Sequence, residues 1–192
     1  MDSPHDQSSE EMEIIKVDNA LSQMASKGEW NEVVNIYRNI PEAHKAIINR
    51  SGDTVLHRAV SDGKEEIVEQ LIAEIISPGG GGKVALEIKN NQGDTPLHVA
   101  VSKGNVRMCK CIAQAYPSLV GVGNLNRETP IFLAALHDKK DIFLRLLKVV
   151  EGDDTPGEHK LYEKFYLIKC NTIVSVIDFS FLQFLIDLRT NF

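Results

Sequence analysis

Apolar residues recur along the chain at helical spacing, and the same arrangement returns several times. In each copy, two stretches of apolar residues with a helical period are separated by a short polar break, which predicts two helices joined by a tight turn. Clear copies follow Thr54 and Thr95, a weaker copy follows Thr129, and a degenerate copy with Leu21 and Ala25 precedes them. Since no single copy can bury its apolar face alone, the pattern predicts four helix pairs stacked into a solenoid.

The copies define a repeat domain that we expect to span residues 14–150. The interval from Thr95 to Thr129 is close to a repeat period of about 33 residues, whereas the interval before it is longer. The Gly-rich run at residues 77–82 cannot lie inside a helix or strand, so the surplus is predicted to form a flexible loop after the second helix of its repeat. The predicted repeats lie near residues 17–48, 49–89, 90–124 and 125–150.

The start of each helix pair carries residues with structural roles. A threonine hydroxyl caps the free N–H groups of a beginning helix, and a proline at the first helical position has no N–H to leave unpaired. Glycine between the two helices suits a positive φ; Asp138 replaces it in the last copy, where we expect a looser turn, and Phe132 replaces the histidine. The residues assigned to this structural motif are Thr54, His57, Gly63, Thr95, Pro96, His98, Gly104, Thr129 and Pro130.

These segments resemble the ankyrin-repeat family, whose T-P-L-H motif stands intact at Thr95 to His98. LSQMASKGEWNEVVNIY, GDTVLHRAV and ETPIFLAALHDKKDIFLRLL are similar to the N-terminal arrays of plant membrane-anchored ankyrin-repeat proteins of the accelerated-cell-death type. The resemblance implies an all-α ankyrin-repeat solenoid of about four helix-turn-helix repeats with β-turn fingers. It also implies an association with defence or stress signalling, and a chain truncated before the transmembrane domain of such proteins.

The two ends of the chain differ from the repeats. Residues 1–13 are acidic, have no Lys or Arg and hold few apolar groups, so we expect a disordered arm. Residues 151–160 have the composition of a linker, and residues 161–192 form an atypical apolar tail without a repeat motif. Lys169, Asp178 and Asp187 disfavour a membrane span in this tail.

Two other interpretations of the tail stay open. The favoured one is a helix that covers the last repeat, and the other is a truncated or alternatively spliced end in place of further repeats. The apolar stripe of such a helix would consist of Phe179, Leu182, Leu185, Ile186 and Leu188.

Composition narrows the choice of partner and compartment. The formal net charge is −6 and no run of Lys or Arg is present, which argues against nucleic acid and favours a basic partner surface. The three cysteines are an odd number, and the chain does not start like a secretory signal. We therefore expect a cytoplasmic protein with reduced thiols, reaching a membrane only indirectly or through a full-length relative.

The sequence gives only weak signals for a catalytic, metal or cofactor site. His57 and His98 stand at the motif position where a histidine usually bonds to neighbouring turns, and Cys109 and Cys111 point in different directions on a helix without completing a zinc site. The Gly79–Gly82 run lacks the Gly-Lys-Ser/Thr of a phosphate loop, and no nucleophile elbow or dinucleotide motif is found. We expect no enzymatic activity, no cofactor and no metal.

The remaining candidate is a binding surface formed by the turn fingers and the inner helices, as in other repeat proteins. We therefore predict a non-enzymatic module that binds another protein; the alternative is a truncated form of a membrane-anchored regulator that associates with its full-length relative. Asn124, Ser61, Val99, Ser102, Leu133 and Leu136 are expected to face the same groove. The predicted partner-binding residues are Asn49, Arg50, Ser51, Asp53, Arg58, Asp62, Asn90, Asn91, Gln92, Asp94, Lys103, Asn126, Arg127, Glu128 and His137.

Overall fold

A computed structural model describes residues 4–79 and 82–151 of the chain, with side chains described for residues 16–79 and 82–150. The tail at residues 161–192, and the linker before it except for its first residue, lie outside the described residues. Within the described part, no helix is both long and apolar enough to cross a membrane.

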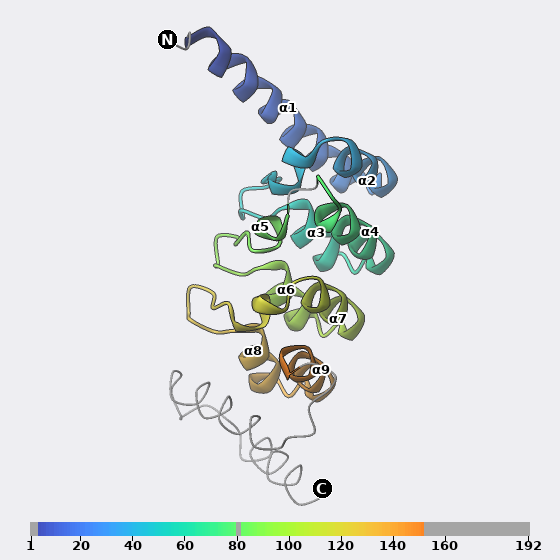
Figure 1. Ribbon diagram of the computed structural model, residues 1–192, viewed down its shortest axis with the longest axis vertical. Coiled ribbons are helices and arrows are strands. Elements are labelled where there is room, and N and C mark those ends of the chain that lie inside the picture. Colours follow the sequence, from blue (N-terminus) through green and yellow to red (C-terminus); the bar gives the residue numbers. More distant parts are fainter. Residues whose placement is uncertain (1–3, 80–81, 152–192) are drawn as a thin grey trace, which may run out of the picture.

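Four antiparallel helix pairs form the array, and short helical turns connect some of them (Figure 1). This arrangement confirms the predicted all-α solenoid of four repeats. The pairs are α1 (Pro4–Lys27) with α2 (Trp30–Asn39), α3 (Val55–Ser61) with α4 (Glu65–Ile76), α6 (Pro96–Lys103) with α7 (Val106–Ala115), and α8 (Pro130–Leu136) with α9 (Lys140–Glu151). The connecting turns are η1 (Pro41–Lys45), α5 (Lys83–Leu86) and η2 (Pro117–Gly121).

Each helix packs on the corresponding helix of the next repeat. The inner helices α1, α3, α6 and α8 contact one another in order, and so do the outer helices α2, α4, α7 and α9. The turn fingers before α3, α6 and α8 project on the side of the array away from the outer helices (Figure 1). The fold therefore presents two distinct surfaces, one of fingers and inner helices and one of outer helices.

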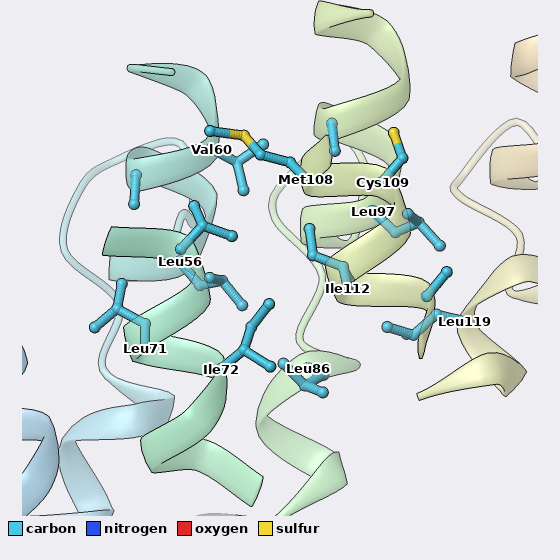
Figure 2. Close-up of a cluster of buried hydrophobic side chains, with 14 of the residues drawn as sticks. Leu56, Val60, Leu71, Ile72, Leu86, Leu97, Met108, Cys109, Ile112 and Leu119 are labelled. Carbon is cyan, nitrogen blue, oxygen red and sulfur yellow. The ribbon is translucent and has the colours of Figure 1, made fainter. Parts of the chain in front are cut away.

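The core runs continuously between the repeats. Leu56 and Leu71 of one repeat and Leu97 and Ile112 of the next are almost completely buried and lie in the same cluster (Figure 2). Burying a side chain of this size contributes roughly 1.5–3 kcal/mol relative to leaving it exposed. Contacts between repeats therefore contribute to the stability of the array together with those within each repeat.

The N-terminal segment differs from the prediction of a disordered arm. Residues 4–13 form the first part of α1, which extends beyond the other helices of the array (Figure 1). Glu, Gln and Met are good helix formers, and acidic residues near a helix N-terminus interact favourably with the helix dipole. The prediction rested on acidic charge and low hydrophobicity, and neither property opposes a helix that continues an ordered one.

The predicted loop of residues 77–82 follows α4 directly, and none of its described residues is helical; residues 80–81 are not described. The short helix α5 follows this loop, and its Ala85 and Leu86 are buried in the core. The Lys83 ammonium lies 5.4 Å from the centre of the Tyr116 ring. Two apolar residues after the glycines thus anchor the insertion to the next repeat.

The turn between α8 and α9 is not looser than its counterparts. Asp138 adopts the left-handed conformation with φ 53°, where Gly104 has φ 72°. The backbone N–H of Lys139 donates to the Ala134 carbonyl at 2.8 Å, the same bond that Asn105 makes to Ala100 at 3.1 Å. Aspartate therefore replaces glycine at the cost of backbone strain and without loss of the turn.

Candidate functional site

Each of the three turn fingers is closed by the asparagine at its start. The Asn49 side-chain oxygen accepts hydrogen bonds from the backbone N–H groups of Ser51 and Asp53 at 2.9 and 3.0 Å. Such bonds hold a tight turn in place of backbone pairing. The same pair recurs where Asn90 accepts from Gln92 and Asp94, and where Asn124 accepts from Asn126 and Glu128.

Hydrogen bonds between successive fingers use the aspartates. Asp53 accepts a bond of 3.0 Å from the Asn90 side-chain amide of the next finger. Asp94 accepts a bond of 3.0 Å from Asn124 in the same way. Both aspartates are half-buried. The residues predicted for partner binding therefore include a group that holds the fingers together.

The two motif histidines connect each inner helix to the following finger. The Thr95 N–H donates to His98 Nδ1 at 3.0 Å, so Nδ1 is unprotonated and the proton resides on Nε2. His98 Nε2 then donates to the Glu128 carbonyl at 3.0 Å. His57 repeats this arrangement, with Thr54 N–H at 3.2 Å and the Asp94 carbonyl at 2.9 Å. These contacts agree with the structural role expected for both histidines.

Burial lowers the pKa of both His57 and His98 below the usual value of 6.5, and the carbonyl each one bonds to and nearby carboxylates only partly offset this. The neutral ring also fits the hydrogen-bond pattern, because a protonated Nδ1 could not accept from the threonine N–H. The unfolded chain consequently binds protons more readily than the folded chain below pH 6.5.

We expect the free energy of unfolding to fall as the pH is lowered from 6.5 towards 5.5. The slope is at most about 1.4 kcal/mol per pH unit for each histidine, since both are deprotonated in the folded state above their lowered pKa. Urea denaturation followed by circular dichroism at pH 7.5, 6.5 and 5.5 measures this dependence of the free energy of unfolding on pH. The His98→Phe variant, which carries the residue found at position 132, should lose part of this slope, and an unfolding free energy that rises on acidification would contradict the assignment.

The predicted partner-binding residues divide into two groups. All of them are exposed or half-buried. One group is engaged internally, by the finger bonds above, by the bond from the Asn91 side chain to the Arg50 carbonyl, or by the Arg58–Asp62 ion pair. The other group has no side-chain hydrogen bond or ion pair within the described residues and consists of Arg50, Ser51, Gln92, Lys103, Arg127 and His137.

Two residues lie differently from the sequence prediction or were missed by it. Leu133, expected to face the groove, is only 6% exposed. Leu125, at the tip of the third finger, was not singled out, yet its side chain is 74% exposed. An apolar residue between two asparagines of a turn was the available signal for an exposed position. Leu125 therefore joins the free finger-tip groups as a contact candidate.

The outer helices carry a different set of contacts. Arg107 of α7 donates to Glu69 at 2.8 and 2.9 Å and to Glu65 at 3.1 Å, both in α4. Beside them lies an open groove of about 590 Å³ whose apolar lining includes Ile76 and Cys111. Residue spacing alone could not reveal these ion pairs, because they join different repeats.

The two thiols in the described part of the chain, Cys109 and Cys111, are not arranged for chemistry. Burial raises the pKa of the Cys109 thiol to about 12 and also raises that of Cys111, so both are protonated at neutral pH. A protonated thiol is a poor nucleophile and metal ligand. Among the described side chains, no group of three or more His, Cys, Asp or Glu residues could hold a metal ion.

The comparisons with known proteins point to one family. A family model described as ankyrin repeats (3 copies) matches the chain twice, over residues 11–119 and 75–157. No curated protein matches the chain. The two matches together cover the four helix pairs, except for the first residues of α1, and both threonine–histidine motifs.

Proposed function

The chain belongs to the ankyrin-repeat family, whose members generally bind other proteins, and we propose that it is a non-enzymatic module that binds a partner protein through its fingers and inner helices. The observation that carries this proposal is the group of exposed polar side chains without internal partners. Side chains that stabilise the fold are saturated by internal bonds, whereas Arg50, Gln92 and Arg127 at the finger tips keep their hydrogen-bonding groups available.

The charges on this face favour an acidic partner. All four acidic residues of the predicted set, Asp53, Asp62, Asp94 and Glu128, already accept hydrogen bonds or an ion pair. Three of its basic residues, Arg50, Lys103 and Arg127, are exposed and have no described partner. This reverses the expectation of a basic partner that the net charge suggested, because net charge does not record which groups are engaged internally. The free guanidinium groups suit bidentate contacts with carboxylates.

Charge reversal tests this proposal. The Arg50→Glu, Lys103→Glu and Arg127→Glu triple variant is expected to bind partner proteins at least about tenfold more weakly, since charge-assisted contacts contribute roughly 1.5–3 kcal/mol each. Affinity capture from extracts with quantitative mass spectrometry identifies the partners, and calorimetry on one purified partner measures the loss. Circular dichroism checks that the variant is folded.

The matched control makes the same charge change on the outer helices, as Lys110→Glu, Arg145→Glu and Lys148→Glu, all at exposed positions. This control should retain its partners. If the finger variant captured every partner as well as the unmodified chain did, the proposed binding face would be wrong. If both variants lost the same partners, the effect would reflect overall charge.

A finer proposal rests on the resemblance to plant membrane-anchored proteins alone. It places the module in defence or stress signalling in the cytoplasm, either free or as a shortened form that associates with a full-length anchored relative. Alkaline carbonate treatment of native membranes distinguishes the free module from the form that associates with an anchored relative. Release of the protein at this chain's size supports a free module, whereas copurification with a larger, carbonate-resistant ankyrin protein supports association with an anchored relative.

A further inference from the structure

Equivalent positions on the inner helices change from polar to apolar along the array. The position occupied by Arg58 in α3 holds Val99 in α6 and Leu133 in α8, counted from the threonine that begins each helix. The next position on the same face follows the same trend, with Ser61, Ser102 and Leu136. The fourth repeat is thus apolar at both positions, whereas the second repeat has two polar side chains there and the third repeat has one.

In the fourth repeat, the positions that would contact a following repeat are also apolar instead of polar. His57 and His98 each donate to a carbonyl of the following finger, but Phe132 stands at this position in α8. Glu69 reaches Arg107 of the next repeat, and its counterpart in α9 is Leu144. Positions that make polar contacts with a following repeat have therefore become apolar in the fourth repeat.

These apolar side chains are shielded from water to different degrees. Phe132 and Leu133 are 8% and 6% exposed, and Leu136 and Leu144 are half-buried against the core. The histidines at the position of Phe132 are buried beneath a following finger, but no fifth helix pair follows α9 among the described residues. A repeat array needs a cover on its terminal apolar face.

We propose that residues 161–192 of the same chain bind this terminal apolar face, defined by Phe132, Leu133, Leu136 and Leu144. This segment holds five of the seven phenylalanines, and its apolar stripe from Phe179 to Leu188 has the spacing of an amphipathic helix. The linker at residues 151–160 begins directly at the end of α9, so the segment is tethered beside the face. Tethering over a short linker gives an effective concentration in the millimolar range, which favours the chain's own segment over a second copy.

The covering inference does not depend on the acidic partner, and its test below uses no partner.

Hydrogen exchange of the full chain, followed by mass spectrometry, tests the contact. The Leu136→Ser and Leu144→Glu double variant carries the residues that the second repeat has at these positions, Ser61 and Glu69, so it is compatible with the fold. Amides of residues 179–188 should exchange slowly in the unmodified chain and about tenfold or more faster in the double variant. Val99→Arg, the corresponding change on α6, is the control and should leave them unaffected.

Three outcomes would overturn the proposal. Fast exchange of residues 179–188 in the unmodified chain means that the segment is not bound. Slow exchange that persists in the double variant means that it is bound elsewhere. Protection that disappears on dilution, together with a dimer mass in light scattering, means that a second copy covers the face.

Discussion

Replacing His98 with alanine is expected to lower the free energy of unfolding by about 3–5 kcal/mol. His98 is fully buried and joins two elements, because its ring accepts from the Thr95 N–H and donates to the Glu128 carbonyl of the next finger. Alanine leaves both of these groups without their partner and opens a cavity the size of an imidazole. Few single side chains in the described array combine a polar bridge between repeats with complete burial.

Urea denaturation monitored by helical circular dichroism measures this change. His137→Ala, at an exposed position on the same face, is the control and should lie within about 0.5 kcal/mol of the unmodified chain. His98→Phe should fall between the two, since phenylalanine restores volume but not the hydrogen bonds. A loss below about 1 kcal/mol for His98→Ala would show that the bridge is dispensable, and a broadened transition would show that the repeats no longer unfold together.

The fold could be predicted because its signals are local and repeated. Thr95, Pro96 and His98 act within one helix turn, so their spacing in the sequence directly reflects their contacts. The binding face was predicted only as a region. Whether Asp53 is free or engaged depends on Asn90 of the next finger, a contact between residues far apart in the chain that no periodicity encodes.

The differences between prediction and structure have the same origin. Leu133 lies at a groove position by its register, but register alone does not report how deeply the side chain is buried in the core. The loop before α5 was predicted from its glycines, whereas the burial of Ala85 and Leu86 directly after it was not predicted. Composition describes what a segment prefers in isolation, and contacts between repeats override that preference.

Close approach of the fingers explains why glycine is found in two of them and arginine in the third. Gly93 has φ 77°, and a Cβ atom there would lie 2.5 Å from the backbone nitrogen of Leu125 in the following finger. Arg127 occupies the same place in the third finger with φ 63°, and no further finger follows it among the described residues. The positive φ is therefore tolerated by a larger residue where nothing stacks upon it, whereas the collision at Gly93 is with backbone and cannot be relieved by a side-chain rotation.

Gly93→Ala is accordingly expected to destabilise the chain by about 2–5 kcal/mol, the sum of a strained positive φ and a backbone collision that forces two fingers apart. Gly63→Ala is the matched control, because Gly63 has φ 70° but no atom within 4 Å of an added Cβ, and it should cost only about 1–2 kcal/mol. Urea denaturation of both variants separates the two contributions. Equal losses would mean that the fingers adjust freely, and hence that their stacking does not hold the binding face in a fixed shape.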